Sequence, residues 1–485
     1  MERNVKIVAT IGPSSQDEIT LSNLINAGLN VARLNFSHGT HEEHAKVITS
    51  LRNLSASLNK PITILQDLQG PKLRVGDLPE QGILLSAGQQ IVLASMDSAH
   101  ETNTQDQDTL TIPMDVPNLT ECLSPGNHVL LDDGNLELLV DSIGKDYIEA
   151  TVILGGLLKS HKGVNLPGAR INIPSFTDKD EIDLAFGLSM KVDTLAISFV
   201  RSAQDIIKVR EAIQNIDPAQ ADIPIIAKLE RPDAILNLDE IIEVSDGVMV
   251  ARGDLGVETA PSVVPVLQKE IIRKANQHNK TVITATQMLD SMINNPRPTR
   301  AEASDVANAV FDGTDAIMLS GETASGKYPI ESVKMMAEIA QEAERHSSEW
   351  SQCKDEPLEP PLDDAISITR AARELAHDRN VSSIAVFTQS GRTALLMSKM
   401  RPRVPILAFT PNYRTYQKMG IYWGVTPFKV PIATNVEEVL NIVDGAIRES
   451  TILQPGEQVV MIFGLPVGTY LQPNLALLHT IGQSS

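Results

Sequence analysis

Cysteine is scarce in this chain. The 485 residues include only Cys122 and Cys353, too few for a disulfide framework or a four-cysteine zinc site. No run of about 18 apolar residues is present to span a membrane. The opening residues, MERNVKIVATIG, enter a strand rather than a signal peptide. We therefore expect a protein of the reducing cytoplasm with no membrane partner.

Positive charge is also in short supply. The chain has 41 Lys and Arg against 61 Asp and Glu, a formal net charge of −20. Binding to nucleic acid needs clustered basic residues that release counterions, so we expect no nucleic-acid partner. An anionic substrate would be repelled at long range. Any anion site must therefore be built from local Lys and Arg side chains and metal ions.

The length exceeds what one hydrophobic core supports and suggests about three domains. Strand and helix patterns alternate over residues 1–70 and again over 172–345, with eight strands in all. Eight such units, with polar residues at the carboxyl ends of the strands, indicate a TIM (β/α)8 barrel. The alternative is an open doubly wound sheet. It is disfavoured because no G-x-G-x-x-G loop follows the first strand.

Two other segments differ from this alternation. Residues 71–171 carry short apolar stretches separated by Gly, Asp and Pro, which predicts an inserted antiparallel β-barrel domain placed as a lid. Residues 344–361 are polar and proline-rich, as in a linker. Residues 346–485, beginning in that linker, then alternate helix and strand again. We expect a C-terminal α/β regulatory domain there.

Charged residues follow two apolar runs in the stretch 223–256, IPIIAKLERPDAILNLDEIIEVSDGVMVARGDLG. Lys228 and Glu230 follow the first run and Asp254 follows the second. Parallel strands present their carboxyl ends on one side, so these three residues should meet. Glu230 and Asp254 could hold Mg²⁺, which prefers carboxylate oxygens, while Lys228 faces a transferring charge. The alternative for any one of them is a surface salt bridge of little worth.

Two other strands also end in polar residues. In ARLNFSHGTHEEH, Arg33, Asn35 and Ser37 alternate along a strand and its loop, so they share a side. The strand in PITILQDLQG ends near Asp67 and leads to Arg74, which is available for a phosphate. The sequence thus predicts one polar site at the carboxyl face of the barrel.

The loop after the second strand leads into a helix. Thr40 and Glu43 form the Thr-x-x-Glu pattern of a capping box. His38, His41 and His44 have the wrong spacing for a zinc site on one helical face. For His41 and His44 we favour a solvated helix start.

These motifs together resemble the pyruvate kinase family, in order and along nearly the whole chain. The resemblance rests on AKLE, ARGDLG, RLNFSHGTH, KGVNLPG and NPRPTRAEASDVANAV. It implies transfer of the phosphoryl group of phosphoenolpyruvate to ADP, giving pyruvate and ATP, the last step of glycolysis. It also implies Mg²⁺ as cofactor, with Mn²⁺ as an alternative, and a homotetramer.

The resemblance assigns roles to individual residues. Lys228 would stabilise the enolate, Arg33 would hold the phosphoryl group, and Glu230 and Asp254 would bind magnesium. Thr286 and Ser320 would lie on the proton route to the enolate, although both hydroxyls could instead bond to backbone. Two further sets are implied: the substrate contacts are Arg33, Lys228, Gly253, Asp254 and Thr286, and the nucleotide contacts are Asn35, His38, Arg74 and Lys162.

At the monovalent-cation site the chain departs from the family pattern. The resemblance places this site at Asn35, Ser37, Asp67 and Leu68. Potassium-dependent relatives have a glutamate where this chain has Lys72. An ammonium group carries the same charge as K⁺, so we expect Lys72 to replace the ion and K⁺ not to be required. The alternative is a Lys72 that points to solvent. Glu43 stands where many relatives carry a tyrosine, which leaves the adenine contact open.

The C-terminal segment has one chemical motif, TQSGRT. Hydroxyls, a glycine and free amides at a helix start suit a phosphate, although a plain helix cap is an equal alternative. The resemblance implies that phosphorylated effectors bind here, while Gln389 leaves the identity of the effector open. The residues concerned are Thr388, Ser390, Gly391, Arg392 and Thr393.

Two other functions would use part of this set. A magnesium-dependent barrel lyase acting on pyruvate or phosphoenolpyruvate needs similar carboxylates, but not the lid or the nucleotide-side residues His38, Arg74 and Lys162. A non-catalytic metabolite sensor could keep the fold and the TQSGRT loop. It should then have lost some of the catalytic and metal-binding residues, and all of them are present.

Overall fold

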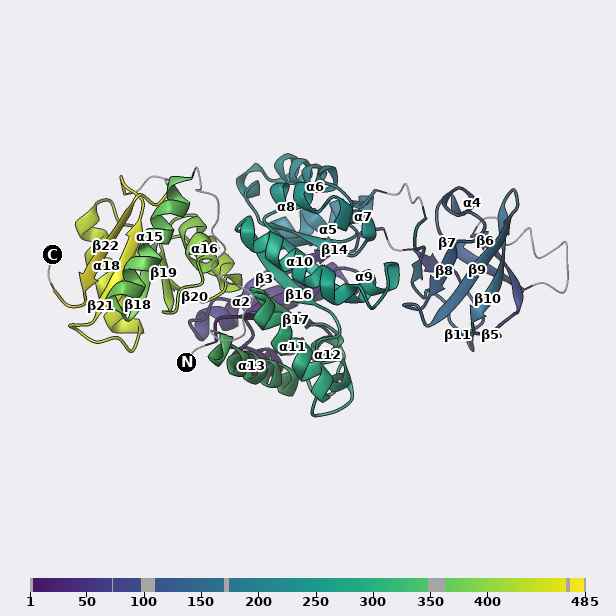
Figure 1. Cartoon of the computed structure of the whole chain (residues 1–485), viewed down its shortest axis with the longest axis horizontal. Coiled ribbons are helices and arrows are strands. Elements are labelled where there is room, and N and C mark those ends of the chain that lie inside the picture. The colour runs from purple at the N-terminus through teal and green to yellow at the C-terminus, as the bar shows by residue number, and fades with distance from the viewer. Residues whose placement is uncertain are drawn as a thin grey trace.

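The computed structural model describes residues 3–71, 73–96, 110–169, 174–347, 363–467 and 472–483. Three parts lie in a row along the longest axis of the molecule (Figure 1). The barrel is in the centre, the sheet of the lid segment lies on one side, and the C-terminal α/β part lies on the other. Within the described ranges we find no helix with the length and hydropathy of a membrane span.

The central part is a closed barrel of eight parallel strands, in the order β1-β17-β16-β15-β14-β13-β3-β2. This confirms the predicted TIM barrel. Nearly every strand residue is buried, as expected for strands covered on both faces. The bounds are Lys6–Ile11 (β1), Val31–Asn35 (β2), Thr63–Leu68 (β3), Thr194–Ile197 (β13), Ile225–Leu229 (β14), Gly247–Ala251 (β15), Thr281–Ala285 (β16) and Ala316–Leu319 (β17).

Helices surround the barrel strands. Most carry an apolar face toward the sheet, and several start at a side-chain cap. The predicted capping box of Thr40 and Glu43 is present and starts α2. The helices are Glu18–Ala27 (α1), His41–Ser57 (α2), Asp178–Ser189 (α5), Ala203–Ile216 (α6), Pro232–Leu236 (α7), Leu238–Val244 (α8), Arg252–Glu258 (α9), Val264–Gln277 (α10), Arg300–Asp312 (α11), Gly321–Ala324 (α12) and Pro329–Arg345 (α13), with short 3-10 turns at Pro218–Gln220 (η1) and Asp290–Ile293 (η2).

The lid segment forms a seven-stranded sheet in the order β12-β8-β9-β10-β6-β7-β4, with a small β11-β5 sheet beside it. Its elements are Arg74–Val75 (β4), Ile83–Leu85 (β5), Gln90–Ser95 (β6), Leu110–Asp115 (β7), Leu119–Cys122 (α4), His128–Leu131 (β8), Leu136–Ile143 (β9), Tyr147–Leu154 (β10), Gly156–Leu158 (β11) and Val164–Asn165 (β12). The two end strands of the larger sheet, β4 and β12, are joined by backbone hydrogen bonds at their ends. Val75 N donates to Lys162 O at 2.9 Å, and Val164 N donates to Leu73 O at 3.0 Å.

The prediction of a purely antiparallel lid is wrong. Strands β6 and β7 pair in parallel, whereas the other pairs of the sheet are antiparallel. A parallel pair needs a long crossover connection, of about a dozen residues or more. The chain between β6 and β7 supplies one, residues 96–109. Most of that connection lies outside the described residues.

The C-terminal part is the predicted α/β unit, a five-stranded sheet in the order β20-β19-β18-β21-β22. The last pair, β21 and β22, is antiparallel and the others are parallel. The elements are Asp364–Arg379 (α15), Ser383–Phe387 (β18), Arg392–Lys399 (α16), Ile406–Thr410 (β19), Tyr413–Lys418 (α17), Met419–Ile421 (η3), Val425–Lys429 (β20), Val436–Ser450 (α18), Gln458–Phe463 (β21) and Leu475–Thr480 (β22).

The predicted linker begins too early. Helix α13 continues to Arg345 because the Glu344 carboxylate accepts the backbone N–H groups of Asn4, at 2.9 Å, and Val5, at 2.6 Å. These bonds anchor the helix end on the start of β1. Residues 348–362, which make up most of the predicted linker, lie outside the described residues.

Candidate active site

Lys228 lies at the centre of the polar site. It is near the carboxyl end of β14, and its side chain is 11% exposed. Its ammonium group lies 2.8 Å from Glu230 Oε1 and 3.4 Å from Asp67 Oδ1. It also donates to Ser198 Oγ at 2.7 Å. The barrel thus brings one lysine and two acids from the ends of two strands, β14 and β3, within contact.

Arg33 reaches the same cluster from β2. Its Nε donates to Asp67 Oδ2 at 2.6 Å, and its NH1 donates to Thr10 Oγ1 at 2.8 Å. A guanidinium held through two of its nitrogens has little freedom to turn. Asp67 is 1% exposed and lies between the two cations, so it fixes the positions of Arg33 and Lys228 relative to each other.

The charges in this cluster stabilise one another. Burial opposes the charged form of Lys228, but attraction to Asp67 and then Glu230 outweighs it and raises the pKa of Lys228 above its ordinary value. Burial likewise opposes the charged form of Asp67. The neighbouring Lys228 and Arg33 overcome this effect and hold the pKa of Asp67 below its usual value. Both groups are therefore charged at neutral pH.

Glu230 and Asp254 form the acidic side of the site. Glu230 is 1% exposed, and its Oε2 accepts the Phe199 N–H at 2.7 Å. Asp254 lies in the first turn of α9. Burial, and then repulsion from Glu230, raise the pKa of Asp254 to about 7. Two acids that repel each other in a buried position match the needs of a divalent cation.

The number of carboxylates in the site, two, also suits a magnesium ion. Among the described residues no group of three or more His, Cys, Asp or Glu side chains could hold a metal ion. Magnesium that works with phosphate substrates is commonly held by one or two carboxylates, with the remaining positions filled by substrate oxygens and water. Glu230 and Asp254 could supply that pair.

The two candidate proton-route hydroxyls differ in their partners. The Thr286 hydroxyl donates to Ala285 O at 2.6 Å and accepts the Gly253 N–H at 2.7 Å, so it bonds to backbone on both sides. Ser320 Oγ is buried and has no hydrogen-bond partner among the described residues. Of the two alternatives that the sequence left open, backbone bonding therefore holds for Thr286 and not for Ser320.

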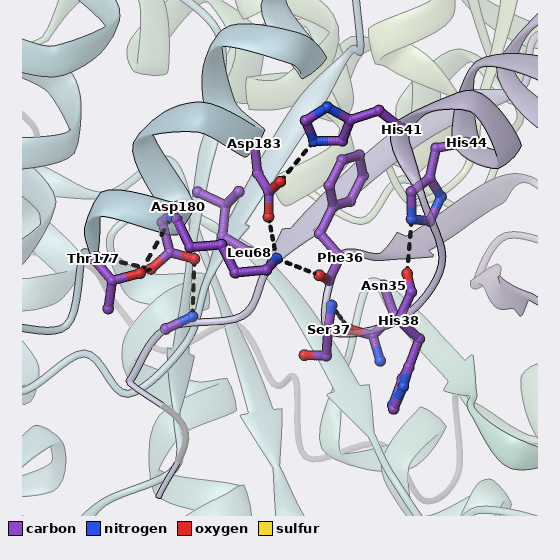
Figure 2. Close-up of polar contacts among 12 residues, drawn as sticks. Asn35, Phe36, Ser37, His38, His41, His44, Leu68, Thr177, Asp180 and Asp183 are labelled. Atoms are coloured by element: carbon purple, nitrogen blue, oxygen red, sulfur yellow. Dashed lines mark hydrogen bonds and ion pairs between the residues drawn. The ribbon is translucent and has the colours of Figure 1, made fainter. Parts of the chain in front are cut away.

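Asn35 is the last residue of β2, and Ser37 and His38 follow in the loop, beside the end of β3 (Figure 2). Asn35 Oδ1 accepts the Ser37 N–H at 3.1 Å, which folds the loop back on itself. At the end of β3, Leu68 O accepts the Ser198 hydroxyl at 2.7 Å. The residues predicted for the cation site thus come from adjacent strands. Lys72, the predicted replacement for the ion, lies outside the described residues.

The prediction of a solvated helix start is wrong for His44, whereas His41 is the first residue of α2 and its side chain is 36% exposed. His44 is buried; its ring stacks on Phe36 with the centroids 4.2 Å apart, and its Nε2 lies 2.9 Å from His38 O. His41 stacks on Phe186 and lies 2.7 Å from Asp183 Oδ1. His44 faces inward onto the loop after β2, whereas His41 lies against α5.

The lid meets the barrel across a cleft. It is lined by Asp133, Asn165 and other lid residues on one side and by Arg201, Arg231, Asp254 and Glu258 on the other. One hydrogen bond crosses it, from Asn165 Nδ2 to Glu258 Oε1 at 2.9 Å. Of the acidic pair, Asp254 therefore opens toward the lid.

The nucleotide-side residues are divided between these two parts. Asn35 and His38 lie on the barrel loop, whereas Arg74 and Lys162 belong to the lid segment. Arg74 is the first residue of β4, and Lys162 pairs with Asp132 at 2.6 Å within the lid. The four residues lie on two parts of the molecule that face each other.

In the C-terminal part, the TQSGRT loop runs into α16. Gly391 has φ +85° and is the N-cap residue, a conformation that strongly favours glycine. Its N–H bonds to Thr388 Oγ1 at 3.0 Å, and Arg392 pairs with Asp363 at 2.9 Å. Ser390 Oγ accepts the Arg392 N–H at 3.4 Å, while Thr393 is buried in the first turn.

Several residues of the site were missed by the sequence analysis. Thr10 and Ser198 hold Arg33 and Lys228 in place. Both lie at or just past the carboxyl end of a strand, so the rule that identified Asp67 could have found them. Arg252 pairs with Asp305 at 2.7 Å and donates to Thr286 O at 2.8 Å, which ties the Thr286 loop to α11. Only the packing of these elements reveals that role.

Comparison with known proteins agrees with this architecture. The sequence profile described as "Pyruvate kinase, barrel domain" matches residues 2–333, and "Pyruvate kinase, alpha/beta domain" matches 366–479. A pyruvate kinase of Geobacillus stearothermophilus is 44% identical over 99% of this chain and 81% of its own length. Pyruvate kinases of Staphylococcus epidermidis and Staphylococcus aureus are 43% identical over the same shares. The chain belongs to the pyruvate kinase family.

Proposed function

We propose that this chain transfers the phosphoryl group of phosphoenolpyruvate to ADP, giving pyruvate and ATP, as its relatives' names imply. The observation that carries the proposal is the cluster of Lys228 with Asp67, Glu230 and Arg33 at the carboxyl end of the barrel. Phosphoryl transfer depends mostly on positioning and charge stabilisation. A cluster of fixed, buried charges supports that kind of catalysis.

We assign the two cations different roles. Arg33 presents a guanidinium already oriented by Asp67 and Thr10, which suits the phosphoryl oxygens. Lys228 remains charged and faces the oxygen that becomes negative when the phosphoryl group leaves. A fixed positive charge at that place stabilises the enolate without reorganisation. Glu230 and Asp254 would hold magnesium, which would supply further positive charge at the phosphate and the enolate oxygen.

The enolate must then gain a proton at carbon. Ser320 has a buried hydroxyl without a described partner, and Thr286 has one bonded to backbone. We therefore propose that Ser320 delivers or relays the proton, while Thr286 shapes the pocket next to Gly253. Asn35, His38, Arg74 and Lys162 would contact the nucleotide from the barrel and the lid.

Regulation and assembly are further proposals. We propose that a phosphorylated effector bound at the TQSGRT loop influences the barrel through α17, which contacts both. The Thr415 hydroxyl donates to Gln389 O at 2.7 Å, and Gln417 O accepts the Thr63 hydroxyl of β3 at 2.6 Å. Four other expectations stay predictions. They are the domain limits at residues 71–171 and 346–485, a homotetramer, a cytoplasmic location, and catalysis without K⁺.

The first experiment measures pyruvate formation from phosphoenolpyruvate and ADP, with Mg²⁺, in buffer free of potassium and ammonium ions. Potassium is then added. We expect full activity before the addition, because Lys72 carries the charge of the ion. Activity that appears only with potassium would keep the kinase and reject the role of Lys72. Folded protein that is inactive in both buffers, with phosphorylated effectors present, would reject the function.

A magnesium-dependent lyase acting on the same compounds is the second candidate. The barrel carboxylates suit both reactions, but the lid, which carries Arg74 and Lys162, is a part that a lyase does not need. Omitting ADP from the assay separates the two reactions. A lyase would consume its substrate without ADP, and a kinase would not.

A further inference from the structure

The first turns of α5 contact the loop that carries the nucleotide-side residues Asn35 and His38. Lys179 Nζ donates to Phe36 O at 2.8 Å and to Asp183 Oδ2 at 2.5 Å. Phe36 lies between Asn35 and Ser37, so this bond acts on the peptide at the centre of the loop. Figure 2 shows Asp183 above that loop, with His41 on its other side.

Asp183 joins three elements. Its carboxylate is 6% exposed and lies 2.7 Å from His41 Nε2, on α2, while its other oxygen takes the Lys179 ammonium. Its backbone carbonyl accepts Gln66 Nε2, from β3, at 2.6 Å. A buried carboxylate shared by two cationic or ring-nitrogen partners has little freedom to move. The loop after β2 is therefore tied to α2, α5 and β3 together.

Asp180, one turn earlier in α5, holds the neighbouring loop. It is 1% exposed, and its Oδ1 accepts the Gly70 N–H, just past β3, at 3.0 Å. Its Oδ2 accepts the N–H and the hydroxyl of Thr177, which closes the capping box of the helix. The loops after β2 and β3 are thus both held by the same end of one helix.

The helix itself lies unusually close to the barrel. A Cβ on Gly187 would lie 1.8 Å from Gln66 Oε1, so only glycine permits the approach. The Gln66 side chain is fully buried under the helix. Helix α5 cannot shift along or away from β3 without breaking these contacts. It is a rigid support for the two loops.

We propose that Lys179 and Asp183 are positioning residues for nucleotide binding: they hold the Phe36 peptide so that Asn35 and His38 face the nucleotide. The inference rests on the proposed function, because that function places the nucleotide at this loop. Lys179 is 50% exposed, and a half-exposed ion pair contributes little to stability. Its effect is therefore on the geometry of the loop. A displacement of about 1 Å in such a group can cost about 100-fold in rate.

The test compares three variants by steady-state kinetics and by calorimetric titration with Mg²⁺ and ADP. Lys179→Met removes the donor to Phe36 O and keeps the length of the side chain. Lys179→Arg keeps a donor and a charge. Lys208→Met, an exposed lysine on the neighbouring α6, is the matched control.

We expect Lys179→Met to raise the KM and the Kd for ADP by about tenfold, a fraction of the loss that a misplaced group can cause. The KM for phosphoenolpyruvate should stay within about twofold, because Arg33 is held by Asp67 and Thr10 and Lys228 by Glu230 and Ser198, none of which belongs to the loop. Lys179→Arg should recover most of the affinity. The thermal midpoint of unfolding should fall only slightly in Lys179→Met, because His41 stays beside the Asp183 carboxylate, and should not change in the other two variants.

Three other outcomes would overturn the inference. Unchanged ADP affinity in Lys179→Met, with an active wild type, would overturn the inference and leave the proposed function intact. Equal losses for both substrates, together with a lower thermal midpoint, would show a merely structural role and also overturn it. A wild type that neither turns over nor binds ADP would overturn the proposed function and this inference with it.

Discussion

The two ends of the barrel both bury charged side chains, but they use them differently. At the amino end, Asp315 pairs with Lys399 and with Arg401, at 2.7 Å, both from the C-terminal part. At the carboxyl end, Lys228 is shared between Asp67 and Glu230 beside the cleft that faces the lid. Buried charge alone therefore does not identify the site.

The neighbours of each charge make the difference. The amino end is closed by the C-terminal part, where Met419, Ile421 and Tyr422 pack in one apolar cluster with Val8 and Leu65 of the barrel. There, one acid faces two cations. At the carboxyl end Glu230 and Asp254 repel each other, and the pKa of Asp254 rises to about 7. Unbalanced charge next to a cleft is what distinguishes the carboxyl end.

The largest expected effect follows from removing the central charge of the carboxyl end. Lys228→Met should lower kcat by about 100- to 1,000-fold or more, because the enolate loses its fixed positive charge. The protein should remain folded, as judged by circular dichroism, and should still bind magnesium. Loss of metal binding in equal measure would assign Lys228 a structural role instead.

The matching change at the amino end is Lys399→Met. The Lys399 side chain is 1% exposed, so its removal leaves Asp315 buried with one partner fewer. We expect the free energy of unfolding to fall by about 3–5 kcal/mol. The kcat of the folded enzyme, measured at low temperature, should not change. A large fall in kcat without loss of stability would show that the two ends are not separate in function.

The smallest expected effect is on how the free energy of unfolding depends on pH. Burial lowers the pKa of His44 below its ordinary value of 6.5, despite its bond to His38 O and the nearby Asp183 and Glu43, while His41 adds repulsion. The unfolded chain therefore binds a proton more readily than the folded protein. The free energy of unfolding should fall as the pH falls through 6.5 and toward the lower folded pKa.

His44→Gln provides the control, because glutamine can still donate to His38 O and does not titrate in this range. We expect the variant to lose part of the decline in stability below pH 6.5, as measured by urea unfolding at several pH values. Identical pH dependence in both proteins would contradict the burial of a neutral His44.

Much of the fold could be read from the sequence because it depends on local patterns. Alternating apolar runs and helical periods predict the eight barrel strands, and Thr-x-x-Glu predicts the start of α2. The parallel pairing of β6 and β7 could not be predicted, since strand direction within a sheet depends on how a connection crosses. The contacts of His41 were missed for a similar reason: Phe186 and Asp183 lie on α5, far along the chain. The stacking of His44 on Phe36 was missed because it depends on how the loop after β2 folds back.

By itself, the sequence determined which residue types stand at the strand ends: Arg33, Asp67, Lys228, Glu230 and Asp254 follow apolar runs whose local pattern is strong. Only the tertiary structure decided how their charges are shared, that Ser320 rather than Thr286 has a hydroxyl without a described partner, and that α5 holds the loops after β2 and β3. The physical reason is that hydrogen bonds and pKa values depend on distances of a few ångströms between residues far apart in the chain. Local sequence patterns contain no such distances.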